Sequence, residues 1–282
     1  MWPIIEHFGD IEQFGEAVAA YVDEHRAPLN KLYMTVNSMR AGTAKGTYVW
    51  CARAVANTRS CGAMVVQKMG ESHVAWVSDP DEETAQAFVH AIRHDGISLS
   101  SLVGPRNGAY RLAHALGGTF YERVRLGNHV LDQAAQLLPA TGIMRRAGMR
   151  DLELLVGWHL AFIDECNLTD DKSRVTEQIR TALSRDETPY WIWDSEGRPV
   201  ATAMLNVQYG MARVGGVYTA PAERQQGHAG ALVSNLSSWA QAQGAEHAFL
   251  YTDLANPVSN GIYRKIGYRM IGEHVHLDRN QA

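Results

Sequence analysis

This sequence of 282 residues has little cysteine, no long apolar run and no excess of basic charge. Its three cysteines, Cys51, Cys61 and Cys166, form no C-x-x-C pair, so we expect neither a disulfide framework nor a metal site. Reduced thiols are typical of a cytoplasmic protein. No segment reaches the apolar length of a membrane span, and the first residues lack a basic stretch followed by an apolar core. We therefore expect a soluble cytoplasmic protein without a membrane partner.

Charge and length narrow the function classes further. The formal net charge of -4 argues against a surface that binds polyanions in general, so nucleic acid is not an expected partner. A hydrophobic fraction of 46% supports ordinary cores. A chain of this length favours two domains rather than one.

A strand end, a glycine-bearing loop and a helix start follow one another after Val217. The segment reads Val-Tyr-Thr-Ala-Pro-Ala-Glu-Arg-Gln-Gln-Gly-His-Ala, and an apolar-periodic run follows it. Free backbone N–H groups at a helix start favour a phosphate. Gly227 permits close approach of a ligand, small Ala229 and Gly230 keep the first turn uncrowded, and Arg224 adds donors suited to phosphate oxygens. Arg224 as a solvated surface charge is the alternative.

A second signal lies between Tyr251 and Tyr268. Asn256 followed by Pro257 predicts a helix N-cap with proline at the first helical position, and Gly267 predicts the helix end. Ser259 and Tyr263 follow Asn256 at spacings of three and four, so we expect all three side chains on one helical face.

Together these two segments resemble the GNAT family of N-acetyltransferases. Residues 224–229 match its Arg/Gln-x-x-Gly-x-Gly/Ala loop, and residues 256–268 match its Asn-x-x-Ala-x-x-Leu-Tyr-x-x-x-Gly-Phe segment. Ser259 in place of alanine and Tyr268 in place of phenylalanine are mild departures from the family pattern.

The resemblance implies an α/β fold with a mixed sheet, acetyl-CoA as the acyl donor, no metal, and direct attack of an amine on the thioester. It implies Tyr263 as the acid for the departing thiolate, although packing of the ring against the sheet is the alternative. His228 is expected to lend its backbone N–H rather than act as a catalyst. The implied acetyl-CoA-binding residues are Val217, Tyr218, Thr219, Arg224, Gln225, Gln226, Gly227, His228, Ala229, Gly230, Asn256 and Ser259.

The general base has no clear candidate in the sequence. Many family members carry a glutamate on the strand before the loop, and none is present between residues 212 and 219. Glu165, Asp253 and His159 are candidates for the base or for binding a cationic substrate, and each also fits a structural or solvated role. Gly215-Gly216 within this strand predicts a bulge or a close approach of ligand backbone.

The second half carries the whole expected pattern of elements, and we predict domains at 1–138 and 139–282. Strands are expected near 143–145, 190–193, 200–207, 212–219 and 248–252, with helices at 151–166 and 173–183 before the two helices that follow the loop and Asn256. Residues 131–142, with Pro139 and Gly142 as breakers, are predicted to form the linker.

The first half repeats the later part of this order more faintly. Residues 74–77 and 99–104 are expected to be strands, and 83–93 and 107–116 helices. After the first of these strands, however, Asp79-Pro80-Asp81-Glu82-Glu83 places carboxylates where a pyrophosphate would need donors. Ala113 or His114 stands where a tyrosine would serve the chemistry. We infer a degenerate tandem GNAT copy, with an unrelated α/β domain as the alternative.

The leading hypothesis is an N-acetyltransferase that transfers the acetyl group of acetyl-CoA to a primary amine, preferably of a small molecule. A protein that binds or senses acyl-CoA without turnover is one alternative, and acetylation of a protein N-terminus or lysine is another. The acceptor, the acyl-chain preference and the oligomeric state stay open at this point.

Overall fold

The chain folds into two compact units, and the first is made from both ends of the sequence. A computed structural model describes residues 2–42, 47–166, 170–185 and 188–280. The first unit comprises Met1–Asn128 with Ile271–Ala282, and the second comprises His129–Met270. The predicted boundary between 138 and 139 therefore falls inside the second unit, and the segment after residue 270, which is predicted to be part of the second domain, belongs to the first unit.

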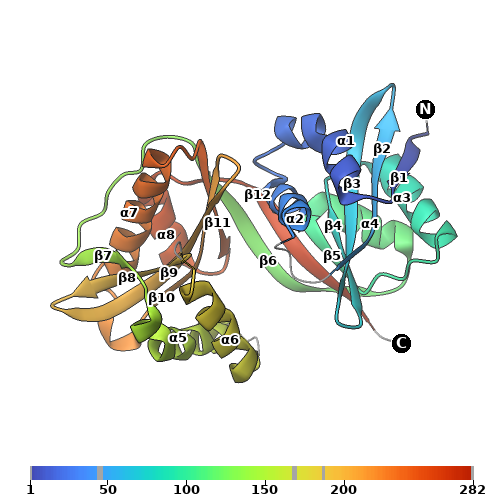
Figure 1. The fold of residues 1–282 in the computed structure, drawn as a ribbon. Helices are drawn as coiled ribbons and strands as arrows, with labels where there is room; N and C mark the ends of the chain where they lie inside the picture. The colour runs from blue at the N-terminus through green and yellow to red at the C-terminus, as the bar shows by residue number, and fades with distance from the viewer. Residues whose placement is uncertain (1, 43–46, 167–169, 186–187, 281–282) are drawn as a thin grey trace. The chain divides into compact units, whose positions relative to one another are not determined.

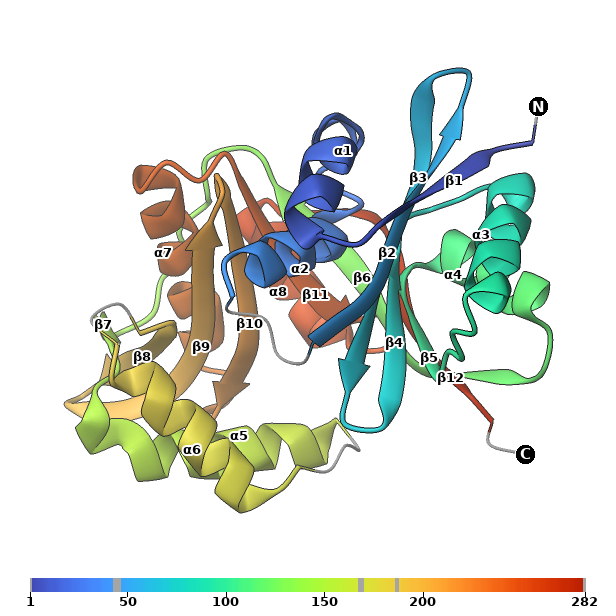
Figure 2. The ribbon, with the colours of Figure 1, turned by 45° about the vertical axis from the view of Figure 1, so that its right-hand side comes forward.

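The first unit is a sheet with helices on both faces (Figure 2). Its strands lie in the order β1-β2-β3-β4-β5-β12-β6, antiparallel from β1 to β4, with β4 and β5 parallel. Its elements are β1 (Ile4–Phe8), α1 (Ile11–Glu24), α2 (Asn30–Arg40), β2 (Thr47–Ala56), β3 (Arg59–Met69), β4 (Ser72–Val77), α3 (Glu82–His94), β5 (Ser101–Pro105), α4 (Arg106–Leu116), β6 (Phe120–Leu131) and β12 (Arg269–Arg279).

Alternation along the strands divides the first unit into two cores. Phe14 of α1 and Val36 of α2 pack on one face of the sheet, against Val65 of β3. Phe88 of α3 and Leu112 of α4 pack on the other face. Because residues two apart in a strand point to the same face, a strand between two helix layers buries both of its faces. The two helix pairs therefore lie on opposite faces of this sheet.

The second unit has the same order of elements. Its strands lie in the order β6-β11-β10-β9-β8-β7, with β10 and β11 parallel. Its elements are β7 (Ile143–Arg146), α5 (Leu152–Glu165), α6 (Lys172–Leu183), β8 (Tyr190–Ser195), β9 (Arg198–Gln208), β10 (Met211–Thr219), α7 (His228–Ala242), β11 (His247–Asp253) and α8 (Pro257–Ile266), with short 3-10 turns at Met149–Asp151 and Pro221–Glu223.

The second unit also has one helix pair on each face of its sheet (Figure 1). Leu232 and Leu236 of α7 pack with Ile266 of α8 on one face. Leu155 of α5 packs with Ile179 of α6 on the other face. The predicted strands and helices of this half are confirmed to within a few residues at their ends. The predicted linker is 131–142. Residues 132–142 are neither helix nor strand, as predicted, whereas Leu131 is the last residue of β6.

Both units share the series strand, two helices, three antiparallel strands, helix, strand, helix. The sequence indicated only the later part of this series in the first half, and the structure extends it to the whole unit. In the first unit β5 pairs with β12, and in the second unit β11 pairs with β6. In both units this partner strand comes from a distant part of the chain. The segment 271–279 is thus an internal strand of the first unit.

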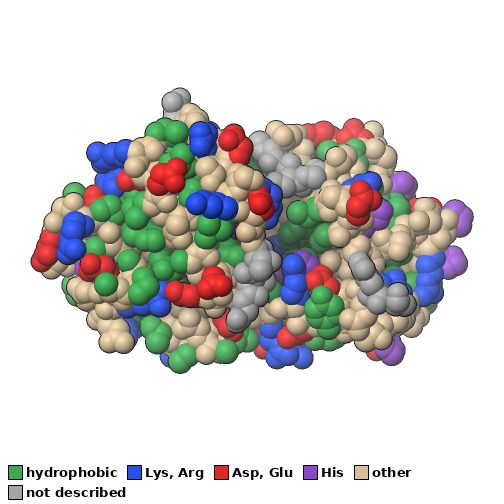
Figure 3. Space-filling view, turned by 90° about the horizontal axis from the view of Figure 1, so that it is seen from below, with side chains coloured by type: hydrophobic (Ala, Val, Ile, Leu, Met, Phe, Trp, Pro, Cys, Tyr) green, Lys and Arg blue, Asp and Glu red, His purple; other side chains and the backbone are tan. Residues whose placement is uncertain are grey.

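Surface side chains of the described residues are mixed in type. On the face drawn in Figure 3, acidic and basic side chains are interspersed with apolar ones. Among the described helices, none combines the length and the apolarity needed to cross a membrane.

Candidate functional site

The two parallel strands of the second unit separate toward their carboxyl ends. Their pairing runs from Met211 with His247 to Val214 with Leu250 and goes no further, although β10 continues to Thr219. A register shift between Gly215 and Tyr218 marks a bulge against β9, and Gly216 has a φ of 56°. The bulge predicted from the glycine pair is confirmed. Separated strand ends in an open α/β sheet are the usual place for a ligand.

The loop after β10 presents the start of α7 toward these strand ends. Gly227 is the N-cap of α7, with a left-handed φ of 83°, and no side chain caps the helix. The N–H groups of the first helical turn, His228, Ala229 and Gly230, have no partner within the helix. A Cβ on Gly227 would lie 3.3 Å from the Pro139 carbonyl oxygen. The glycine is therefore required both by its backbone conformation and by its neighbour.

Arg224 lies in the loop as predicted, but its guanidinium is held by protein groups. Its Nη2 donates a hydrogen bond to Glu165 Oε1 at 2.6 Å, and its Nε donates to the Thr219 carbonyl at 3.1 Å. The guanidinium also lies 5.5 Å from the centre of the Tyr218 ring. The hydrogen bond to Glu165 is the largest factor that raises the pKa of Arg224. The cation expected at a phosphate site is thus present and paired with a carboxylate.

The helix α8 has the ends that the sequence predicts. Asn256 is its N-cap and accepts a hydrogen bond from the Ser259 N–H at 3.1 Å, with Pro257 at the first helical position. Gly267 ends the helix with a left-handed φ of 112°. The capping role of Asn256 is confirmed, and its contact with a cofactor stays a prediction.

Tyr263 is on α8 and lies in the core of the second unit. Its side chain is 8% exposed, and its ring meets that of Tyr268 edge-on, with centroids 6.2 Å apart. Burial raises the pKa of Tyr263 to about 12. The phenol therefore stays protonated at neutral pH and is able to donate a proton or a hydrogen bond.

Close packing joins α7 to α8, the helix that carries Tyr263. A Cβ on Gly230 would lie 3.4 Å from Ile262 Cγ2 and 3.0 Å from Leu138 Cδ1. The Leu138 N–H donates to Ser234 Oγ at 3.1 Å, so the linker lies along α7. The sequence indicated only a linker here, and no periodic signal marks Leu138 as a contact of the loop helix.

The three candidates for the base differ in their surroundings. Glu165 is engaged by Arg224, and Asp253 accepts a hydrogen bond from the Ala255 N–H at 2.8 Å. Partial desolvation and the charges of Glu165 and Asp253 raise the pKa of Cys166, which places both carboxylates near that thiol. His159 lies half-buried on α5. The base stays unassigned.

His228 is more unusual than the sequence indicated. Its side chain is 4% exposed, and neither ring nitrogen has a hydrogen-bond partner among the described residues. Its backbone N–H lies in the first turn of α7, as expected. Among the described residues there is also no group of three or more His, Cys, Asp or Glu side chains placed to hold a metal ion.

This arrangement agrees with a sequence comparison. Residues 155–268 match the model of the acetyltransferase (GNAT) family. Over these residues the chain is similar to the GNAT family. Members of this family transfer an acyl group from acetyl-CoA, so the match supports an acyltransferase activity. No curated protein matches the sequence significantly.

Solved structures extend the likeness in fold to almost the whole chain. A GNAT acetyltransferase of Colwellia psychrerythraea is 14% identical with a TM-score of 0.61, covering 99% of this chain and 100% of its own. A GNAT of Sphaerobacter thermophilus is 14% identical with a TM-score of 0.63, covering 99% and 97%. A tandem GNAT protein of the clavulanic acid biosynthesis pathway is 12% identical with a TM-score of 0.60, covering 99% and 100%. The architecture is therefore two tandem GNAT folds.

The first GNAT fold differs from the second at the start of its loop helix. Asp81 is the N-cap of α3, and its carboxylate accepts a hydrogen bond from the Thr84 N–H at 2.8 Å. Hydrogen bonds from Thr84 lower the pKa of Asp81. An internal carboxylate thus occupies the place that the uncapped Gly227 leaves open at α7.

The parallel strands of the first fold are also closed together. A Cβ on Gly104 would lie 2.5 Å from the Val77 carbonyl oxygen, and one on Gly108 would lie 2.6 Å from that of Ser78. Backbone therefore lies directly on backbone at the carboxyl ends of β4 and β5. The acidic cap and this closure support the inference of a degenerate copy.

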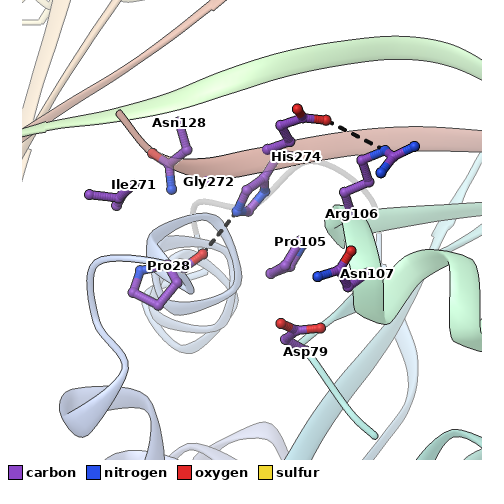
Figure 4. Close-up of a pocket in the computed structure, with 10 residues that line it drawn as sticks. Pro28, Asp79, Pro105, Arg106, Asn107, Asn128, Ile271, Gly272 and His274 are labelled. Atoms are coloured by element: carbon purple, nitrogen blue, oxygen red, sulfur yellow. Dashed lines mark hydrogen bonds and ion pairs between the residues drawn. The ribbon is translucent and has the colours of Figure 1, made fainter. Parts of the chain in front are cut away.

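A cavity of about 340 Å³ with both polar and apolar lining residues remains beside these strand ends (Figure 4). Asp79 and Asn107 lie on one side of it, and Pro28 lies across from them. His274 Nε2 hydrogen-bonds to the Pro28 carbonyl at 2.9 Å, and Arg106 pairs with Glu273 at 3.4 Å. The lining of the cavity includes the carboxylates of Asp79 and Glu273 as well as the Arg106 guanidinium.

Proposed function

We propose that the second GNAT fold transfers an acetyl group from acetyl-CoA to a primary amine of a small molecule. The observation that carries this proposal is the set of separated strand ends after Val214 and Leu250, with the uncapped start of α7 and the buried Tyr263 in the same unit. In the first fold the ends of β4 and β5 are closed together, and Asp81 caps the start of α3. The proposal therefore assigns one working site to the chain.

The residues of the second unit fit acetyl-CoA as the acyl donor. Gly227 keeps the loop free of a Cβ, and the first-turn N–H groups of α7 suit a pyrophosphate. Gln225, with a left-handed φ of 64°, and Gln226 complete the loop before Gly227. The unpaired edge of β10 at Val217, Tyr218 and Thr219 offers backbone groups to an extended chain. Asn256 and Ser259 stand at the first turn of α8.

The acyl donor supplies a thioester carbonyl, and the protein supplies position and proton transfer. In the transfer, the amine nitrogen forms a bond to the carbonyl carbon while the carbon–sulfur bond breaks. Tyr263 gives its proton to the leaving sulfur, and the attacking nitrogen loses a proton to solvent or to a base. The products are an amide and a free thiol, so the charges balance once Tyr263 recovers a proton.

A small acceptor is favoured over a protein acceptor by analogy with two-domain relatives. The tandem GNAT protein of the clavulanic acid pathway belongs to a route that makes a small molecule. A protein that binds acetyl-CoA without turnover is the second candidate, favoured by the missing glutamate on β10 and the pairing of Glu165 with Arg224.

Calorimetric titration with acetyl-CoA tests the proposal first. We expect one site per chain in the parent protein, with loss of binding when Arg224→Ala is combined with Gly227→Asp. Release of free thiol on addition of an amine panel then reports turnover. No binding contradicts the proposal, and two sites per chain contradict the assignment of a degenerate first fold.

A further inference from the structure

His228, the first residue of α7, carries a buried imidazole that no described residue satisfies. Its side chain is 4% exposed, and neither Nδ1 nor Nε2 has a hydrogen-bond partner among the described residues. The two buried serines of the same helix differ from it. Ser234 Oγ donates to the Ala231 carbonyl at 3.0 Å, and Ser237 Oγ donates to the Val233 carbonyl at 2.8 Å. Because a buried polar group without a partner costs free energy, the ring of His228 calls for an explanation beyond packing.

The helical position of His228 places its ring on the side of α7 that faces the sheet. Residues three and four apart share one helical face. Ala231 and Leu232 follow His228 at these spacings, and both are 0% exposed in the core that α7 forms on the sheet. The pairing of β10 with β11 ends at Val214 and Leu250, and the chain enters α7 from the far end of β10. The ring therefore lies on the sheet side of the uncapped helix start, where the two strands have separated.

The first fold differs at the equivalent helical position. Its helix α3 begins with Glu82 after the N-cap Asp81, and Glu82 is exposed. The strand ends beside it are closed together, with Gly104 against the backbone of β4. Of the two folds, the one with the uncapped helix start and the separated strands is the one with the buried imidazole. The ring thus accompanies the open site rather than the fold as such.

An imidazole can donate a hydrogen bond whether it is neutral or protonated. A neutral ring carries one N–H and one acceptor nitrogen, and a protonated ring carries two N–H groups. In acetyl-CoA, the pantetheine arm leaves the pyrophosphate as a chain with hydroxyl and amide oxygens that accept hydrogen bonds. The first-turn N–H groups of α7 suit the pyrophosphate, and His228 belongs to the same turn. The part of the arm that starts at the pyrophosphate is therefore the part that this ring would meet.

We propose that the His228 imidazole donates a hydrogen bond to an oxygen of the pantetheine arm of acetyl-CoA, in the part next to the pyrophosphate. This inference rests on the proposed function, because it needs the acyl donor at the start of α7. It assigns the ring to binding of the arm, in addition to the backbone N–H that the loop offers to the pyrophosphate. A ligand that carries the pyrophosphate without the arm gains nothing from the ring.

Calorimetry of the full chain with acetyl-CoA, dephospho-CoA and ADP tests this inference. Dephospho-CoA is ADP with the pantetheine arm attached, so this pair of ligands differs by the arm. His228→Leu removes both ring nitrogens and is expected to weaken binding of acetyl-CoA and dephospho-CoA by about three- to tenfold, the effect of one neutral hydrogen bond. The affinity for ADP is expected to stay unchanged. His228→Gln keeps an N–H donor and should lose less affinity than His228→Leu.

The stability of the free protein separates this role from a packing role. Because the ring has no described partner to lose, His228→Leu should leave the free energy of unfolding in urea unchanged or higher when no ligand is present. Ser237→Ala is the matched control, because it removes a satisfied buried hydroxyl from the same helix. It should lower stability and keep the affinity for all three ligands. An unchanged circular dichroism spectrum shows that each variant is folded.

The possible failures point to different errors. Unchanged acetyl-CoA affinity in folded His228→Leu, equal weakening of dephospho-CoA and ADP, or equal losses in His228→Leu and His228→Gln each overturn this inference alone. Loss of stability in ligand-free His228→Leu with parental acetyl-CoA affinity assigns the ring to packing and also overturns it. Failure of the parent protein to bind acetyl-CoA overturns the proposed function as well, so the two failures are distinguishable.

Discussion

Arg224 and Glu165 are joined by a hydrogen bond of 2.6 Å between a guanidinium in the loop before α7 and a carboxylate at the end of α5. Both side chains are partly exposed, at 42% and 47%. The carboxylate therefore holds the one arginine that the GNAT loop offers to a phosphate.

Replacement of Glu165 by glutamine should tighten acetyl-CoA binding. The neutral amide competes less well for the guanidinium, and an exposed ion pair contributes about 1 kcal/mol or less, so we expect about a two- to fivefold lower Kd. Calorimetric titration measures the change, with Glu153→Gln on the first turn of α5 as a control that keeps the parent affinity. Weaker binding in Glu165→Gln contradicts the competition and assigns the carboxylate a supporting role.

Gly227→Ala is expected to weaken both acetyl-CoA binding and stability. A left-handed φ costs an alanine about 1–2 kcal/mol, and the new Cβ would approach the Pro139 carbonyl oxygen. Gly157→Ala is the matched control, because this glycine is inside α5 with nothing within 4 Å of a Cβ. We expect Gly157→Ala to raise stability by about 0.5–1 kcal/mol. Urea unfolding of both variants measures the difference.

Tyr263→Phe should separate binding from chemistry. Loss of the phenol proton donor is expected to lower kcat by about 100-fold with acetyl-CoA affinity retained. Tyr268→Phe removes a buried hydrogen bond of 2.8 Å to Ser237 and should cost about 1 kcal/mol of stability without a comparable loss of kcat. Equal kcat values in the parent and Tyr263→Phe would contradict the acid role.

The pH dependence of turnover gives an independent test of Tyr263. A folded-state pKa of about 12 keeps the acid protonated well beyond the usual tyrosine range. The rate should therefore rise as the acceptor amine loses its proton and show no fall up to about pH 10, the ordinary tyrosine pKa. A fall centred near pH 9 in a protein that remains folded is the result that would exclude this assignment.

Leu277→Ala should destabilise the first unit and spare the second. Leu277 of β12 is 0% exposed and packs in the core under α3 and α4, so its truncation should cost about 2–5 kcal/mol. Met270→Ala, at a side chain that is 45% exposed, is the control. Hydrogen exchange resolved by peptide locates the loss. Faster exchange confined to residues 129–270 contradicts the assignment of β12 to the first unit.

Local signals made the second unit predictable. Asn256, Pro257 and Gly267 determine the ends of α8 by their own backbone preferences, and Gly215-Gly216 indicates the bulge. The first unit was harder to predict, because its hairpin between β2 and β3 turns at Asn57 and Thr58 without a glycine. Both residues have a left-handed φ there, 49° and 66°, and the residue types in the turn do not predict this conformation.

Long-range contacts explain the rest of the difference. The pair of Arg224 and Glu165 joins residues far apart in sequence, and no periodicity connects them. The closure of the first fold depends on where Gly104 meets the backbone of β4 and where Gly108 meets the backbone just after β4. Such contacts follow from tertiary packing, so the sequence indicated the types of residue in the site and the structure supplied their partners.

The position of β12 also reverses the usual order of folding during synthesis. Residues 129–270 leave the ribosome before residue 271. The strands of the second unit are therefore available while β5 still lacks β12, its neighbour on the side away from β4. The earlier part of the chain must wait, with an open strand edge, for the segment that emerges later. The part of the chain that is made first is therefore completed last, and a pause in translation before residue 271 would leave it exposed to aggregation.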